Sequence, residues 1–398
     1  MPSRRRLLAG LGAAGLAATA GCTGIADGTF SRGTDTDTDW PMGRHDTLNT
    51  AYAPDAAAPR DGPTERWTHG GGFDARTPAV VGDTAYVPTA EALVALDTGD
   101  GSERWRFAPE SQPWPAPPVV HDGRVFVTMR DEDTVHAVDA ASGEALWTDD
   151  ADRHVHAAAG LLAGRVVNEP AVLVGDGNGR VRALEPGTGD ERWELDVFGG
   201  VRAFAHRFQR LYVGTTSGEV YVFHADGEGD GDEPRELWRG EVGGRVEGIV
   251  PTSNGIAVAS FGEPLANLES DNAGEPMWTA DRERAGSVPA YAGSWLLSTG
   301  YDAVSATRTY DGRRGWRAAA PLGSAPPVAA GDTLYAAGET SVHAFALDGG
   351  GPLSGAKRWS YPVPGGGVQG LAVADGALFV ARQAAGGNET TLYCLEPN

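Results

Sequence analysis

The chain has 398 residues and a formal net charge of −22, with 54 acidic side chains against 32 lysines and arginines. This charge excludes nucleic acid as a partner, because a surface that binds phosphates must be basic. Length alone suggests several domains, but a sequence repeat of nearly constant length, described below, is better evidence of the fold than length. The 57 glycines and 26 prolines separate short runs rich in Val, Tyr and Phe, which predicts many short strands joined by turns and no helix after residue 22.

The basic residues are almost all arginine, since Lys357 is the single lysine. The acidic residues are spread along the whole chain rather than gathered in one tail. This composition resembles that of haloarchaeal proteins, whose acidic surfaces stay solvated in concentrated salt. A mesophilic protein from a GC-rich genome with an acidic surface is the alternative.

The first 22 residues predict export. Residues 3–8 read SRRRLL, which resembles a twin-arginine signal, and the apolar run 7–21 is too short to span a bilayer comfortably. The run leads into TAGC, which resembles a lipobox with Cys22 as the lipidated residue. Thr19 stands where a lipobox prefers Leu, Val or Ile, so an uncleaved anchor and a soluble secreted product are alternatives. We expect an exported protein, lipid-anchored at the extracellular face of the cytoplasmic membrane.

Residues 23–39 predict a disordered tether ahead of a folded domain at 40–398. They are polar and rich in Thr, Asp and Gly, and such a segment cannot bury enough apolar surface to fold. With Cys22 lipidated, Cys394 is the one cysteine left, so the mature protein has no intramolecular disulfide. Cys394 stands where other repeats have Ala, which predicts a small buried residue rather than a reactive thiol.

Eight of the eleven tryptophans recur at a spacing of 38 to 46 residues. This period fits one four-stranded β-propeller blade per tryptophan. We expect each indole to be buried between adjacent blades rather than to take part in catalysis. The recurring residues are Trp67, Trp105, Trp147, Trp193, Trp238, Trp278, Trp316 and Trp359.

The unit at residues 117–147 shows the predicted order of strands. An apolar strand led by proline (PPVV) is followed by a turn and a second strand (RVFVT). A third strand (TVHAVDA) runs into a turn at Ser142 and Gly143, and a fourth strand begins near Trp147. Glycine suits this turn because it accepts positive φ without steric cost, and the neighbouring hydroxyl bonds free backbone groups.

The turn and its tryptophan are similar to the tryptophan-docking motif of the PQQ-like (pyrroloquinoline quinone repeat) β-propeller family, A-x-D-x-x-T-G-x-x-x-W. Three copies match well, and the resemblance covers about residues 40–398. Later units are less regular: Arg308 replaces the acid in one, and another keeps only Gly274 and Trp278. The matching residues are Ala95, Asp97, Gly101 and Trp105; Ala137, Asp139, Ser142, Gly143 and Trp147; and Ala183, Glu185, Thr188, Gly189 and Trp193.

The two ends of the chain complete each other. The C-terminal YCLEPN contains the first half of the motif, with Cys394 and Glu396, but neither the turn nor the tryptophan. The N-terminal PTERWTH supplies Trp67 without the first half. We therefore expect residues 64–70 to form the outer strand of the last blade, which pairs the termini and hides both open sheet edges. The predicted fold is all-β, an eight-bladed propeller of four-stranded antiparallel blades.

The resemblance implies two different functions. Quinoprotein dehydrogenases of this superfamily carry an adjacent Cys-Cys disulfide and a calcium site of Glu, Asn and Asp. This chain has no Cys-Cys pair and no matching ligand set, so neither PQQ nor calcium nor enzymatic activity is expected, since fold alone does not confer function. The chain resembles instead the lipoprotein propeller of the bacterial barrel-assembly machinery. This predicts a monomeric, non-enzymatic scaffold for envelope proteins; an envelope ligand-binding or sensory propeller and a degenerate PQQ-dependent oxidoreductase are the alternatives.

Three local patterns suggest other sites. His154 and His156 share one face of a predicted inner strand and offer two metal ligands without a visible third. The insertion 226–236 begins like a calcium loop, but Leu237 stands at the twelfth position instead of Glu, so a solvated hairpin tip is expected. Asn388 begins an N-x-T sequon that an exported protein can carry glycosylated.

The first strand of each propeller blade lines the central channel. The residues that open these strands include three arginines, which at one mouth of an acidic protein can hold an anion or a partner's carboxylates. The candidate channel-mouth residues are Arg76, His154, His156, Arg202, Arg245, Glu247 and Gln369.

Overall fold

The described chain contains strands, turns and loops but no helix. The computed structural model describes residues 30–70, 75–109, 116–129, 133–150, 160–162, 169–225, 233–271, 274–284, 287–350, 356–383 and 390–398. Nothing in these ranges is therefore a helix of the length and apolarity that crossing a membrane requires.

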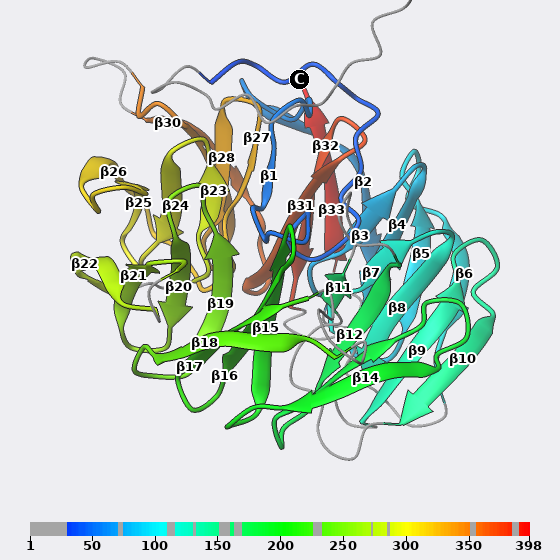
Figure 1. Ribbon diagram of the computed structural model, residues 1–398. Helices are drawn as coiled ribbons and strands as arrows, with labels where there is room; N and C mark the ends of the chain where they lie inside the picture. Colours follow the sequence, from blue (N-terminus) through cyan, green and yellow to red (C-terminus); the bar gives the residue numbers. More distant parts are fainter. Residues whose placement is uncertain are drawn as a thin grey trace, which may run out of the picture.

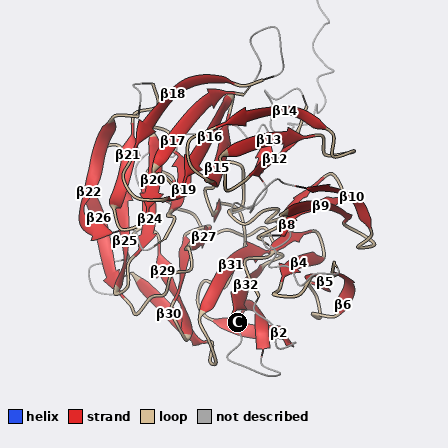
Figure 2. Cartoon of the chain, turned by 90° about the horizontal axis from the view of Figure 1, so that it is seen from below, coloured by secondary structure: helices blue, strands red, loops and turns tan. Residues whose placement is uncertain are grey.

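Eight sheets form a ring around a central channel (Figure 1, Figure 2), which confirms the predicted eight-bladed propeller. In blades 1 to 7 four antiparallel strands follow one another in the chain from the channel outward. Blades 1 to 4 consist of β3 (Ala79–Val81), β4 (Thr84–Pro88), β5 (Leu93–Asp97) and β6 (Glu103–Phe107); β7 (Val119–His121), β8 (Arg124–Met129), β9 (Thr134–Asp139) and β10 (Ala145–Asp150); β11 (Gly160–Leu162), β12 (Ala171–Gly175), β13 (Arg180–Leu184) and β14 (Glu191–Asp196); and β15 (Val201–Arg207), β16 (Arg210–Thr215), β17 (Glu219–His224) and β18 (Arg235–Glu241).

Blades 5 to 7 repeat the same order. They consist of β19 (Val246–Pro251), β20 (Ile256–Ser260), β21 (Pro264–Leu268) and β22 (Pro276–Arg284); β23 (Ala290–Ala292), β24 (Trp295–Thr299), β25 (Ala303–Arg308) and β26 (Arg314–Ala319); and β27 (Val328–Ala330), β28 (Thr333–Ala337), β29 (Ser341–Ala346) and β30 (Lys357–Pro362).

Burial follows the position of a strand within its blade. All residues of the second strands β12 and β28 are buried, because a neighbouring blade covers each face. Such strands read as continuous apolar runs rather than as alternating ones. The outer strand β26 alternates between exposed and half-buried residues, since one edge and part of both faces meet solvent.

The recurring tryptophans pack between blades as predicted. A Cβ built on Gly143 would lie 2.7 Å from the Trp105 ring, so only glycine lets the indole of one blade rest on the turn of the next. Gly143 also has a φ of 76°, which glycine adopts without strain. The Trp105 Nε1 donates a hydrogen bond to the carbonyl oxygen of Ala140 at 3.0 Å. The same ring-to-glycine contact joins Trp67 to Gly101, Trp147 to Gly189, Trp238 to Gly274, Trp278 to Gly312 and Trp316 to Gly349.

The acid of the motif shapes the same turn. The Asp139 carboxylate accepts hydrogen bonds from the backbone N of Ser142 at 2.8 Å and from its hydroxyl at 2.9 Å. These bonds hold the pKa of Asp139 below its usual value. In blade 1 the Asp97 carboxylate accepts a hydrogen bond from Gly99 N at 2.8 Å. The motif residues thus organise a turn that the preceding tryptophan covers.

Blade 8 joins the two ends of the chain, as predicted. It consists of β31 (Val368–Ala374), β32 (Ala377–Arg382), β33 (Thr390–Pro397) and, outermost, β2 (Pro63–Gly70). Trp67 pairs with Cys394, which is fully buried. Burial raises the pKa of the Cys394 thiol to about 12, which agrees with the predicted inert residue.

The two ends of the propeller carry different connections. The turns between first and second strands, and between third and fourth strands, lie together at one end, the motif end. The connections between second and third strands, and those that lead to the next blade, lie at the opposite end, the loop end. An antiparallel four-stranded meander allows no other arrangement.

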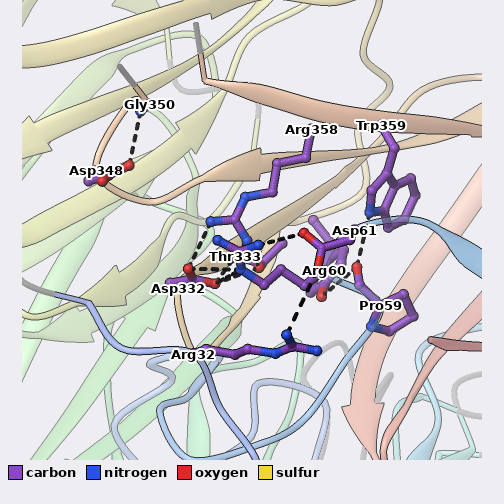
Figure 3. A network of polar contacts seen from close by, with 12 residues as sticks. Arg32, Pro59, Arg60, Asp61, Asp332, Thr333, Asp348, Gly350, Arg358 and Trp359 are labelled. Carbon is purple, nitrogen blue, oxygen red and sulfur yellow. Dashed lines mark hydrogen bonds and ion pairs between the residues drawn. The ribbon is translucent and has the colours of Figure 1, made fainter. Parts of the chain in front are cut away.

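The N-terminal segment replaces the motif turn that blade 8 lacks. Trp359 Nε1 and Tyr335 Oη donate hydrogen bonds to the carbonyl oxygen of Pro59 at 3.0 and 3.1 Å. Arg60 and Arg358 converge on Asp332, with nitrogen–oxygen distances of 3.1 and 2.8 Å (Figure 3). This network fixes the chain where it crosses blade 7 to reach β2.

The folded chain begins earlier than the predicted boundary at residue 40. Asp35 pairs with Ala56, and Thr34 N donates a hydrogen bond to Asp55 O at 3.0 Å. Asp39 accepts a hydrogen bond from Gly82 N at 2.8 Å. Residues 30–39 of the predicted tether therefore lie against the propeller, held by these hydrogen bonds and by Phe30, whose ring lies 6.4 Å from that of Tyr52 and packs against the core. Residues 23–29 lie outside the described residues.

Candidate functional site

The channel is filled by the chain's own residues 38–53, the hub segment, which the sequence analysis did not predict. In Figure 1 this segment, with β1 (Tyr52–Ala53), lies in the middle of the ring. Its hydrogen bonds reach seven of the eight blades. Their partners on the blades include Asp375, Val80, Val120, Pro289, His206, Phe204, Ile249, Tyr291 and Ala329.

The hub segment enters at the motif end through Trp40. Trp40 and Val80 exchange two backbone hydrogen bonds, at 2.7 and 2.8 Å, next to the bond between Asp39 and the turn glycine Gly82. The Trp40 side chain is completely buried, although its Nε1 has no hydrogen-bond partner among the described residues. Its ring lies 4.8 Å from that of His45. Trp40 therefore contributes through apolar packing and fills the channel at this end.

A tight turn at Asp46 reverses the segment inside the channel. The Asp46 carboxylate accepts hydrogen bonds from Leu48 N at 3.1 Å, Thr50 N at 2.9 Å and the Thr50 hydroxyl at 2.6 Å. Asn49 has a φ of 57° and donates its amide to the carbonyl oxygens of Phe204 and Ile249, at 2.7 and 2.9 Å. The turn is thereby fixed to blades 4 and 5.

The segment then leaves by the end at which it entered. β1 runs parallel to the inner strand β27, and Gly331 N donates a hydrogen bond to Ala53 O at 3.0 Å. Gly331 belongs to the turn after β27, so entry and exit both lie at the motif end. The hub segment consequently closes that end of the channel.

A cavity of about 270 Å³ is left between the hub segment and the inner strands. Its wall includes residues at or near the starts of β7, β11, β15 and β19, toward the loop end, and extends to His206 near the other end of β15. Blade 3, to which no hydrogen bond of the hub segment is seen in the described chain, contributes Gly160, Leu161 and Leu173. The hub segment contributes Met42, Gly43, Arg44, Thr47 and Asn49.

Arg44 is the charged group of the hub segment in this wall. Its guanidinium donates hydrogen bonds to the carbonyl oxygens of Pro327, Val288 and Pro289, at 3.3, 3.4 and 2.5 Å. Burial lowers the pKa of Arg44 to about 10, against the opposing influence of Asp46. The arginine remains charged at neutral pH, deep inside the channel.

Two of the predicted channel-mouth arginines meet at one carboxylate. Arg202 Nη2 lies 2.7 Å from Glu247 Oε2, and Arg245 lies 2.7 Å from Glu247 Oε1. Arg202 and Glu247 line the cavity, whereas Arg245 stacks on the exposed Phe261 ring at 4.9 Å. The structure thus brings these three residues together between blades 4 and 5.

The other predicted residues are placed differently. Arg76 and Gln369 do not line the cavity, although Thr77 and Leu371 do. Arg76 N donates a hydrogen bond to Pro88 O at 2.9 Å. Four predictions fall outside the described residues: Cys22, His154, His156 and Asn388. So does most of the acidic insertion, at 226–232. Within the described chain no group of three or more His, Cys, Asp or Glu side chains is arranged to hold a metal ion.

Large aromatic side chains are exposed at the loop end. Phe198, Phe261 and Tyr301, the aromatic rim, are 66%, 66% and 85% exposed. They lie in the connection between blades 3 and 4 and in the second-to-third-strand turns of blades 5 and 6. Single exposed apolar residues are ordinary, but several large exposed aromatics on loops of one end make a candidate binding surface.

One protein-family profile matches most of the chain, at residues 55–260 and 266–388; the family is described as "Outer membrane protein assembly factor BamB". No curated protein sequence matched.

Solved structures share the fold at low identity. The computationally designed Ika8 protein superposes with a TM-score of 0.68 and 12% identity, covering 83% of this chain and 99% of that one. BamB from Moraxella catarrhalis gives 0.53 and 19%, covering 67% and 80%. A europium-containing methanol dehydrogenase gives 0.65 and 13%, covering 87% and 90%. At such identities the likeness establishes the propeller alone, since fold does not imply function.

Proposed function

Because the chain belongs to the family described as outer membrane protein assembly factor BamB, we propose that it is a non-enzymatic scaffold that binds other proteins of the cell envelope. The observation that carries this proposal is the aromatic rim. Exposed aromatics and arginines supply most of the binding energy at protein interfaces. Phe261 offers both, since Arg245 stacks on its ring at 4.9 Å.

The partner is an envelope protein that docks on the loop end. The motif end is closed by the hub segment and by the ion pairs around Asp332, whereas the side chains of the aromatic rim are exposed at the loop end. A monomeric propeller leaves this end accessible. The proposed interface is therefore a loop surface on a rigid ring, an arrangement common to propellers and other scaffolds.

Crosslinking in native membranes tests the proposal. The wild-type chain, crosslinked at the organism's own salt concentration and captured, is expected to recover a reproducible envelope partner. The triple variant Phe198→Ser, Phe261→Ser and Tyr301→Ser is expected to lose it. Phe208→Ser is the matched control, because Phe208 is 64% exposed at the motif end and also carries a stacked arginine, Arg207 at 5.3 Å.

The two possible negative outcomes have different meanings for the aromatic rim and for the scaffold function. Recovery of the same partner by the triple variant would reject the aromatic rim as the interface. Absence of any partner from the wild-type chain would reject the scaffold itself.

The proposed location is the outer face of the cell membrane, with a lipid on Cys22. This part of the proposal is supported by the N-terminal SRRRLL and TAGC sequences. In cells that produce the full chain, Cys22→Ser is expected to move the protein from the membrane fraction to the soluble fraction. An unchanged membrane fraction would indicate an uncleaved anchor instead. If the composition reflects a haloarchaeal source, these fractionations require molar salt.

The fold shared with a methanol dehydrogenase leaves a degenerate oxidoreductase as the competing proposal. Reconstitution with pyrroloquinoline quinone and calcium, followed by gel filtration, distinguishes the two. The scaffold is expected to retain no quinone absorbance and to reduce no dye with methanol. Retained quinone would favour the oxidoreductase.

A further inference from the structure

The channel cavity contains a buried positive charge for which the described chain provides no ion pair. Arg44 bonds three backbone carbonyl oxygens, and its Nε is enclosed without a hydrogen-bond partner among the described residues. Asp46 stabilises the charge electrostatically, but its oxygens accept hydrogen bonds from Leu48 and Thr50. A charge removed from water is costly unless an opposite charge compensates it.

Arg202 adds a second cation to the same wall. Its Nη2 is paired with Glu247, but its Nε is enclosed without a partner in the described chain. Glu247 is shared, because Arg245 occupies its other oxygen at 2.7 Å. Among the residues that line the cavity, Arg44 and Arg202 are therefore two cations against one carboxylate, Glu247. The cavity therefore has an excess of positive charge inside a chain whose net charge is −22.

The rest of the wall is largely apolar, and the cavity has room for a small molecule. With a water occupying about 30 Å³ of liquid, the volume corresponds to about nine waters. Small-molecule sites commonly combine an apolar wall with a few placed polar groups. The apolar residues of the wall include Met42, Val119, Leu161, Leu173, Phe204 and Val328.

We propose that the channel cavity binds a small organic monocarboxylate with an apolar body. The carboxylate supplies the missing counter-charge to Arg44 and Arg202, and the body packs on the apolar wall. Planar guanidinium groups suit carboxylates because each presents several fixed donors. The site is independent of the proposed scaffold function, since it lies inside the ring and not on the aromatic rim.

Calorimetric titration of the folded full chain with benzoate and hexanoate, at constant ionic strength, tests this site. Benzamide and hexanamide are the neutral controls of nearly the same shape. Each carboxylate is expected to bind saturably, at one equivalent, and at least about tenfold more tightly than its amide. Equal affinity for acid and amide, or no saturable binding of either acid, would overturn the proposal.

Charge variants identify the cavity as the place of binding. Arg202→Gln is expected to weaken benzoate binding about tenfold, and Glu247→Gln to strengthen it, because each changes the excess charge of the wall. Arg210→Gln is the control: it removes one positive charge from the exposed pair with Asp271, outside the cavity, and should leave affinity unchanged. If Arg44→Met folds, it tests how much the cation of the hub segment contributes to benzoate binding. If Arg202→Gln and Arg210→Gln weakened benzoate binding equally, the effect would reflect only the overall charge of the protein, and the site would be rejected.

Discussion

In the outer ring, one contact repeats around the molecule: in six blades of the described chain, the indole rests on the turn glycine of the next blade, as Trp105 does on Gly143. In the hub, backbone N–H groups of the inner strands donate to carbonyl oxygens of the segment, but among the described residues no side-chain contact repeats. Trp40 pairs with Val80, Asn49 with two carbonyl oxygens, and Arg44 with three others, each once. The comparison teaches that repetition spaces the blades, whereas one unrepeated segment decides which end of the channel is closed.

The largest effect is expected from the hub. Trp40→Ala should lower the free energy of unfolding by about 4 kcal/mol, because a completely buried indole is removed and its cavity cannot collapse against rigid inner strands. In the ring, Trp316 is partly exposed, and Trp316→Ala should cost about 2 kcal/mol. Urea-induced unfolding of both variants measures the difference.

A conservative variant checks that the loss in Trp40→Ala comes from removal of the buried ring. Trp40→Phe keeps an aromatic ring and removes an indole N–H that has no partner among the described residues. It should recover more than half of the loss in Trp40→Ala. A loss in Trp40→Ala below that in Trp316→Ala would show that the hub does not stabilise the ring.

The ring is tested at a turn glycine. Gly143→Ala places a Cβ 2.7 Å from the Trp105 ring and strains a φ of 76°, so it should destabilise the protein by about 3 kcal/mol. Gly123→Ala meets the same strain at a φ of 71° but no atom within 4 Å, and should cost only about 1 kcal/mol. Equal losses in thermal or urea unfolding would mean that docking of the indole contributes nothing.

The ring could be predicted from the sequence because its interactions repeat as side-chain types. The acid, the glycine and the tryptophan recur at a fixed spacing, so each copy supports the interpretation of the next. The split blade followed from two half motifs, and Trp67 does pair with Cys394. The structure adds what no repeat encodes, namely that Pro59 provides the carbonyl oxygen for Trp359 in place of a missing turn.

The junction at Asp332, where Arg60 of the N-terminal segment meets blade 7, is sensitive to acid. Burial alone would raise the pKa of this carboxyl, but hydrogen bonds and charge from Arg358 and Arg60 lower it to about 2. Because the folded pKa lies below the unfolded value of about 3.9, the stabilisation is complete above about pH 4 and is lost as the pH falls toward 2. The wild type should exceed Asp332→Asn by about 2 kcal/mol at pH 6 and by much less at pH 2.5.

Urea unfolding at several pH values measures this dependence. Asp311→Asn is a control, since Asp311 pairs with Arg308 within one turn of blade 6 and does not join the N-terminal segment to the ring. A constant difference between the wild type and Asp332→Asn from pH 6 to 2.5 would contradict the role of the ion pairs.

The hub could not be predicted in the same way. Its partners are mostly backbone groups, which leave no signature in the sequence, and the polar composition of residues 23–39 favoured disorder. Arg202 and Glu247 were found because they open predicted first strands, which line the channel, whereas Arg44 lies in a segment outside the repeats. One signal was present: Trp40 is one of three tryptophans outside the recurring spacing, and a large aromatic directly after a polar segment indicates that the chain is packed at that residue.

The smallest effect on stability is expected at the loop end. Phe261→Ser should change the free energy of unfolding by less than about 0.5 kcal/mol, because Phe261 is 66% exposed and its stacked Arg245 keeps Glu247 as a partner. Phe208→Ser should change the free energy of unfolding equally little, since Phe208 is 64% exposed and has its own stacked arginine. The two variants should therefore differ in partner recovery and not in urea unfolding. A loss of more than 1 kcal/mol in Phe261→Ser alone would assign that ring to folding, and its exposure would then no longer argue for a docking surface.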